Sequence, residues 1–266
     1  MKLLTCKIEC EKVKKIIDNI TCPIWICGGS GVVEGWLGSG TERGEPFKSQ
    51  KGGNAMLEEI IRKWGGHEVS AMQVYTDLFG LGEGLIQRQD EEPGAFKSNP
   101  LGYWKNDGEQ RGHRRILFDD TFEETLKEMQ EADFSIMNGL TYFGKRNAAE
   151  NASKMYAMIF DVDGITDETL NNFLSGAYVS EAYPVPNYVV LSGHNIHLYY
   201  RFEIPIALYP NIKLQLKELK YSLTGKMWNR YTSTEKKVQF QGINQGFRVI
   251  GGKTKIEGVR VRAFEL

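Results

Sequence analysis

The sequence predicts a mixed α/β protein of two lobes: an N-terminal α/β lobe over residues 1–134, and a C-terminal lobe over residues 135–266 built on an antiparallel sheet with flanking helices. Three observations favour this class. Apolar residues at helical spacing alternate along the chain with short apolar runs of strand length. One run is a strand that passes through a tight Ser-Gly turn and returns, as antiparallel neighbours do. A chain of 266 residues with 41% hydrophobic content can also bury a sizeable core.

The start of the chain holds all four cysteines, which are Cys6, Cys10, Cys22 and Cys27. Their spacing could hold zinc, but neither pair has the tight two-residue knuckle of structural zinc sites. The alternative is an amphipathic segment over residues 6–20, in which cysteines pack as small apolar groups. Residues 24–27 predict a short strand ahead of a glycine-rich turn at 28–31, which lacks the Lys and Ser/Thr of a Walker phosphate loop.

Two helices are expected in the N-terminal lobe, over residues 54–64 and 120–132, because each has apolar side chains on one face. Residues 80–115 between them are rich in glycine and charged side chains, and we expect a long loop there. The loop contains the basic run 111–115, which is either a solvated charge cluster or a contact to a template strand.

Residues 134–144 predict a hairpin or strand pair with its turn at Asn138-Gly139. A short helix over residues 148–154 should then lead into the next strand. Lys145 and Arg146 lie just before this helix and upstream of two acids, which suggests that they bind phosphate.

The most informative stretch is residues 156–164, an apolar strand that ends in Asp161-Val162-Asp163-Gly164. Positions i and i+2 of a strand share a face, so the two carboxylates project from one side at about 7 Å along the strand. Carboxylates this close repel unless a cation or a shared proton lies between them. Asp161 and Asp163 are therefore candidate metal ligands, and the alternative is a strand end whose Asp-x-Asp-Gly forms an ordinary turn.

A second motif lies in residues 187–202, where an apolar strand runs into Ser192-Gly193 and returns as a strand that carries His197. Ser192 and His197 can face one pocket from adjacent strands. A hydroxyl, exposed backbone N–H groups and an imidazole suit a phosphate chain. The alternative is a core histidine, because the residues after His197 look buried.

A third segment, residues 238–255, alternates polar and apolar side chains and then gives Arg248 and a Gly-Gly turn followed by Lys253 and Lys255. These cations would converge on the acids if the turn faces them. A β-hairpin with solvated lysines is the alternative.

The formal charge is −1, so any nucleic-acid surface has to be local. No stretch approaches the roughly 18 apolar residues of a membrane span, and charged residues from Lys7 onward interrupt any signal-peptide core. We therefore expect a cytoplasmic protein without membrane association.

At these motifs the chain resembles the archaeo-eukaryotic primase superfamily, in particular the primase-polymerases of plasmids, phages and integrated mobile elements. That family has an apolar strand ending Asp-x-Asp or Asp-x-Glu, a Ser-x-x-x-x-His strand pair, and a strand with a third acid ahead of an Arg-x-x-Gly turn. The matching residues are Asp161 and Asp163, Ser192-Gly193 with His197, and Arg248 with Gly251. The resemblance covers about residues 135–264.

The resemblance implies one bilobal catalytic domain, with an RRM-like sheet in the C-terminal lobe and a cleft for nucleotide and template. The implied activity is that of a DNA primase or polymerase, in which a 3′-hydroxyl attacks the α-phosphate of an NTP or dNTP. Asp161, Asp163 and His197 would be catalytic, with Mg²⁺ or Mn²⁺ held by the two aspartates. The implied phosphate contacts are Ser192, Gly193, His197 and Arg248, with Lys145, Arg146, Lys253 and Lys255 for phosphate or template. The implied partners are a single-stranded DNA template and, if this chain is the catalytic piece of a longer protein, a helicase domain or protein.

One position departs from the family pattern. Where the third acid should precede Arg248, the chain has Gln239 and Gln241, which can coordinate weakly but bring no charge. The metal site would then rest on Asp161 and Asp163, or Glu235 would have to reach it.

Two other functions fit part of the sequence. A catalytically weak nucleic-acid-binding replication module on the same fold would account for the missing acid. A haloacid-dehalogenase-like phosphatase would use Asp161 as nucleophile and Asp163 as general acid. The chain has no aspartate after Asp167 to help hold Mg²⁺, however, and this chemistry gives Ser192 and His197 no role.

Overall fold

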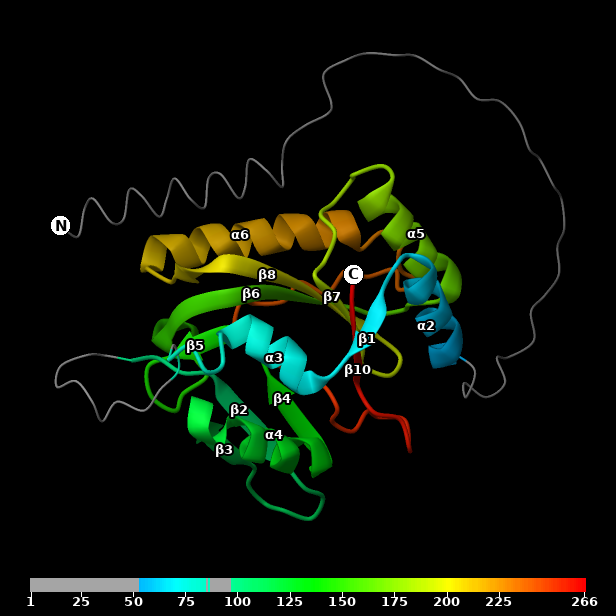
Figure 1. Ribbon diagram of the computed structural model, residues 1–266. Coiled ribbons are helices and arrows are strands. Elements are labelled where there is room, and N and C mark those ends of the chain that lie inside the picture. The colour runs from blue at the N-terminus through cyan, green and yellow to red at the C-terminus, as the bar shows by residue number, and fades with distance from the viewer. Residues whose placement is uncertain (1–52, 85, 87–96) are drawn as a thin grey trace, which may run out of the picture.

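The computed structural model describes residues 53–84, 86 and 97–266, which form a mixed α/β fold around two antiparallel sheets (Figure 1). The expectations for residues 6–31, the zinc cysteines included, lie outside the described residues. The helices are α2 (Gly53–Lys63), α3 (Ala71–Phe79), α4 (Phe122–Glu131), α5 (Asp167–Tyr178) and α6 (Pro210–Met227), with 3₁₀ turns at Asp119–Thr121 and Ala149–Asn151. Within this described part, no helix is long and apolar enough to cross a membrane.

Among the described residues, the larger sheet has six strands in the order β1-β10-β7-β8-β6-β5, and the smaller has four in the order β3-β2-β4-β9. The larger sheet consists of β1 (His67–Val69), β5 (Leu140–Tyr142), β6 (Ala152–Val162), β7 (Tyr188–Leu191), β8 (Ile196–Ala207) and β10 (Arg262–Glu265). The smaller consists of β2 (Leu101–Lys105), β3 (His113–Ile116), β4 (Phe134–Met137) and β9 (Phe247–Arg248). Every neighbouring pair is antiparallel.

Side-chain alternation along β6 divides the core into two layers. Met158 and Phe160 point to one face of the larger sheet and join the core with α5 and α6. Ala157 and Ile159 point to the other face and join the core with α3, α4 and the smaller sheet. In Figure 1, α6 lies along one side of β6 and β8, with α3 and the smaller sheet on the opposite side. Asp161 continues the Ala157 and Ile159 series, so it faces the layer between the two sheets.

Several expectations are confirmed. The helices expected at 54–64 and 120–132 are α2 and α4, and the apolar strand at the Asp161 motif is β6. The strand, turn and returning strand of residues 187–202 are β7 and β8, which pair directly.

The hairpin expected at Asn138-Gly139 is wrong. β4 belongs to the smaller sheet and β5 to the larger, so Asn138-Gly139 carries the chain from one sheet to the other. A Cβ at Gly139 would lie 2.7 Å from the Ala157 carbonyl oxygen, so glycine serves close packing here. The Asn138 side chain accepts a hydrogen bond from the Leu140 N–H and donates one to the Tyr142 hydroxyl.

Three further segments differ from expectation. Residues 101–105 and 113–116 form β2 and β3 instead of loop, because Leu101 and Trp104 are buried. Only residues 149–151 of the expected 148–154 helix are helical, because burial of Ala152 and Met155 favours the start of β6. Of the alternating run 238–255, only Phe247–Arg248 is a strand. The larger sheet takes β1 from before residue 134 and its other strands from after it, and the smaller sheet takes β2 and β3 from before residue 134 and β4 and β9 from residue 134 onward.

Candidate functional site

Asp161 and His197 lie directly opposite each other on neighbouring strands. The register of β6 and β8 pairs them, and Asp161 Oδ1 is 3.7 Å from His197 Nε2. Phe247 of β9 meets the His197 ring edge to face, with 5.3 Å between ring centroids. The pair therefore lies where the end of β6 approaches the smaller sheet.

Burial drives both members of this pair towards their neutral forms. The His197 side chain is 4% exposed, and burial, assisted by the charge of Arg248, lowers its pKa to about 3. Burial, followed by the charge of Asp163, raises the pKa of Asp161 to about 7, although Lys220 and Lys255 oppose the rise. At neutral pH the contact therefore joins a neutral imidazole to a partly protonated carboxyl, and is not a full ion pair.

Two polar atoms of the pair have no hydrogen-bond partner. Asp161 Oδ1 and His197 Nδ1 are both buried and unbonded. Buried polar atoms are nearly always bonded, and leaving one unpaired costs about 1–3 kcal/mol. A ligand that bonds to these atoms would remove that penalty, which makes the pair a candidate site on structural grounds alone.

Gln241 holds the main chain of Asp161. Its Oε1 accepts a hydrogen bond from the Asp161 N–H at 3.1 Å, and its Nε2 donates to the Asp161 carbonyl at 3.0 Å. β5 pairs with β6 only as far as Met155, so the side chain takes the place of a strand partner at this edge. Both polar groups of Gln241 are engaged in this way, so the side chain supports the main chain of Asp161 instead of coordinating a metal ion.

A lysine outside the sequence motifs is buried beside Asp161. Lys220 of α6 is 1% exposed, and its Nζ donates to the Gly242 carbonyl at 3.0 Å. The ammonium lies 5.7 Å from the centroid of the Phe160 ring and 5.3 Å from that of Phe247. Burial lowers the pKa of Lys220 to about 7, and the Asp161 charge opposes this.

Asp163 lies just beyond the end of β6, in a more polar environment than Asp161. Its carboxylate takes a hydrogen bond from the Asn195 side chain, and the Ser233 hydroxyl donates to its carbonyl oxygen. Burial and the charge of Glu235 raise the pKa of Asp163, whereas Asn195 and Lys255 lower it. Glu235 is therefore near enough for its charge to act on Asp163.

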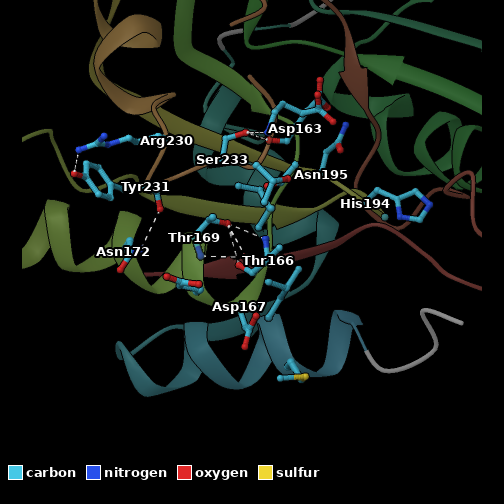
Figure 2. Close-up of a pocket in the computed structure, with 18 of the residues that line it drawn as sticks. Asp163, Thr166, Asp167, Thr169, Asn172, His194, Asn195, Arg230, Tyr231 and Ser233 are labelled. Atoms are coloured by element: carbon cyan, nitrogen blue, oxygen red, sulfur yellow. Dashed lines mark hydrogen bonds between the residues drawn. The ribbon is translucent and has the colours of Figure 1, made fainter. Parts of the chain in front are cut away.

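Asp163 borders a cavity of about 1070 Å³ (Figure 2). Its walls come from the start of α5, the β7–β8 turn and residues 230–235; Asp161 is not part of them. The acidic side chains in the described wall are Asp163, Asp167, Glu168 and Glu235, and Arg230 is the single Lys or Arg there. Figure 2 shows Asp163 and Asn195 close together, while Asp167 lies farther along the wall on α5. An anionic substrate would need a cation to enter such a cavity.

The Ser192-Gly193 turn also borders this cavity. The Ser192 hydroxyl donates to the Asn195 carbonyl at 3.0 Å, so it closes the turn. Gly193 lines the cavity with a φ of 111°, and a Cβ there would lie 3.3 Å from Thr254 Cβ. The expected third-acid replacement Gln239 lines the same cavity.

Of the expected phosphate-binding cations, Lys255 and Arg248 are the two whose charges act on the aspartates and on His197. Lys255 lowers the pKa of both Asp161 and Asp163, and Arg248 acts on the pKa of His197. Lys253 lies two residues before Lys255 and pairs with the Asp133 carboxylate at 2.7 Å.

Lys145 and Arg146 occupy a different position. They are exposed and precede β6 at Ala152. Asp161 lies nine residues after Ala152 along the strand, which is about 30 Å. Lys145 and Arg146 therefore lie beyond the end of β6 that is far from Asp161.

The acids fit a metal ion that is shared with a substrate. Within the described residues, no three His, Cys, Asp or Glu side chains form a metal site by themselves. Mg²⁺ is commonly held by one or two carboxylates and completes its shell with substrate phosphates and water. Asp161 and Asp163, with the unbonded Oδ1 of Asp161, match that requirement. Mn²⁺ accepts the same oxygen ligands.

No family model matches the chain, and no curated protein does. Among solved structures, the AEP domain of the cyanophage S-2L primase-polymerase matches with a TM-score of 0.43 and 14% sequence identity. The match covers 71% of this chain and 89% of that one. The similarity is remote, and what the site can do is inferred from its own side chains.

Proposed function

We propose that this chain is a nucleotidyltransferase of the primase-polymerase type, bilobal and RRM-like in its catalytic lobe, which copies single-stranded DNA with NTP or dNTP. One observation carries the proposal. Asp161 and His197 face each other across β6 and β8 with a buried, unbonded polar atom on each, and Asp163 follows two residues later. Carboxylates beside a phosphate-binding group are what nucleotidyl transfer requires.

Each side chain has a role in this reaction. The 3′-oxygen bonds to the α-phosphorus while the bond to the bridging oxygen of the β-phosphate breaks, and pyrophosphate leaves with that electron pair. Asp161 and Asp163 act as carboxylate ligands, and the proton of the hydroxyl passes to water. His197 is neutral and can donate an N–H to a phosphate oxygen. Lys255, whose charge acts on both aspartates, supplies positive charge for the triphosphate, whereas the Arg248 side chain lies on the face of β9 opposite Phe247.

A divalent ion held by Asp161 and Asp163 would activate the hydroxyl and offset charge on the phosphates. The adjoining cavity supports this requirement, since four acidic side chains and one arginine line its described wall. Gln241 fixes the main chain of Asp161, so the carboxylate keeps its orientation when a ligand binds.

The test is incorporation of labelled nucleotides on an unprimed single-stranded template with Mg²⁺ or Mn²⁺. The wild type should make product, and Asp161→Asn should reduce the rate by about 100-fold or more. Asp167→Asn is the matched control, because Asp167 is exposed on α5 in the same cavity and should change the rate less than about twofold. No synthesis by the wild type, or equal loss in both variants, would contradict the proposal.

A nucleic-acid-binding module without catalysis is the second candidate. It is favoured by Gln241, which is committed to the Asp161 main chain, and by the lack of a third converging carboxylate in the described residues. Binding of an oligonucleotide without synthesis would favour this candidate. Phosphate release from a small ester would instead favour the phosphatase.

A further inference from the structure

The smaller sheet has one face that carries aromatic and cationic side chains. Its register aligns Arg114, Tyr103, Ile136 and Arg248 in one row across β3, β2, β4 and β9. Directly opposed residues of a sheet share a face. Phe134 lies two residues before Ile136 and therefore joins the same face.

The opposite face of this sheet belongs to the core. Trp104, Met137 and Phe247 are buried there, and a Cβ on Gly102 would meet Met129 of α4. By contrast, Phe134 is 37% exposed and Arg114 is exposed. The row of aromatic and cationic side chains is therefore on the solvent side of the sheet.

The exposed face has the chemistry of a stacking surface. The rings of Tyr103 and Phe134 meet edge to face at 6.2 Å, with Arg114 5.9 Å from the Tyr103 centroid and Arg248 4.5 Å from that of Phe134. Unpaired bases stack on aromatic rings and on guanidinium planes. Lys105 adds another cation two residues from Tyr103, and the row of paired side chains contains no acid.

We infer that this open face, defined by Tyr103, Arg114, Phe134, Ile136 and Arg248, binds single-stranded nucleic acid by base stacking. The row crosses three gaps between strands, about 14 Å, which is room for about four bases stacked at 3.4 Å. β9 borders both regions, because Arg248 lies on the open face and its neighbour Phe247 touches His197 on the other. The inference rests on the proposed function in taking a template strand as the ligand.

Binding of a fluorescent oligothymidylate, followed by anisotropy, tests this inference. Phe134→Leu and Tyr103→Leu keep apolar bulk but remove the rings, and each should raise Kd about fivefold or more. Arg114→Gln should lower the slope of log Kd against log salt by about 0.7, the value for one lost phosphate contact on a single strand. Tyr209→Leu is the control, because Tyr209 is an exposed aromatic at the start of α6, away from this face.

The inference is overturned if the wild type does not bind the oligonucleotide, or if both leucine variants, shown to be folded by thermal unfolding, bind as the wild type does. An unchanged salt slope in Arg114→Gln would also contradict it. Asp161→Asn separates the two proposals, because it leaves the open face intact. If the wild type synthesises product but Phe134→Leu and Tyr103→Leu bind the oligonucleotide as it does, only the proposed function stands. If these variants bind more weakly but the wild type synthesises nothing, only the inference stands.

Discussion

Replacement of Lys220 by methionine should make the protein more stable at low pH while impairing the site. Methionine has a similar length and no charge. The pKa of Lys220 falls from its ordinary value of 10.5 to about 7 because the ammonium is buried. That difference corresponds to about 5 kcal/mol. Below about pH 7, where Lys220 is charged in both the folded and the unfolded chain, burial of the charge lowers the free energy of unfolding by this amount.

Part of this gain is offset. The variant loses the hydrogen bond to the Gly242 carbonyl, about 2 kcal/mol for a charged donor, and the contacts with the rings of Phe160 and Phe247, about 1 kcal/mol each. Lys220→Met should therefore be about 1 kcal/mol more stable than the wild type near pH 6. Between about pH 7 and 10.5 the unfolded wild-type chain holds the Lys220 proton and the folded chain does not. Wild-type stability therefore rises with pH in that window, and the advantage of the variant should shrink and then reverse.

Urea unfolding of both proteins at about pH 6, 7.5 and 9 measures the effect. Lys226→Met, at an exposed position on the same helix, is the control and should change the free energy of unfolding by less than about 0.5 kcal/mol. Lys220→Met should also shift the pH profile of nucleotide incorporation upward, because Asp161 loses a cation that lowers its pKa. If Lys220→Met were destabilised equally at all three pH values, the buried charge would carry no penalty and the reasoning would be wrong.

Three other predictions follow from the same geometry. Gln241→Leu removes two hydrogen bonds to the Asp161 main chain and should lower the free energy of unfolding in urea by about 1–3 kcal/mol; a change under about 0.5 kcal/mol would count against this support. Binding of Mn²⁺ to the protein should tighten between about pH 6 and 8, because burial raises the pKa of Asp161 to about 7 and the ion has to displace that proton; an affinity independent of pH would exclude Asp161 as a ligand. Gly139→Ala should lower Tm by about 3–10 °C because its Cβ would meet the Ala157 carbonyl, whereas Gly225→Ala has open space and should not lower it; equal melting would refute the packing argument.

Alternation along the chain predicted the strands that carry Asp161 and His197, but not how these strands pair. The Ser-Gly pair marked the turn by which β7 returns as β8, so the pattern placed His197 on the returning strand, whereas Ser192 itself lies in the turn after β7. These are local properties that the sequence states directly. The opposition of Asp161 and His197 depends on β6 pairing with β8, which the strand pattern allows but does not specify.

Features that depend on distant parts of the chain could not be predicted. Asn138-Gly139 has the same local turn preference in a hairpin and in a crossing between sheets, and the approach of Ala157 decides between them. Gln241 has no local pattern that aims it at the Asp161 main chain. Lys220 did leave a signal, since it follows Leu216 by four residues on the buried face of α6, but only the fold shows what it meets there.

The pairing of β1 with β10 has a consequence for how the chain folds during its synthesis. His67 lies opposite Glu265, and the Arg262 guanidinium bonds Glu68, which is 194 residues away in the sequence. β1 is therefore made early and has no β10 to pair with until residues 262–265 have left the ribosome. Pairings over such distances form slowly and leave strand edges exposed meanwhile. We expect the central β6–β8 pair to form first, and the β1 edge of the larger sheet to close as a late step of folding.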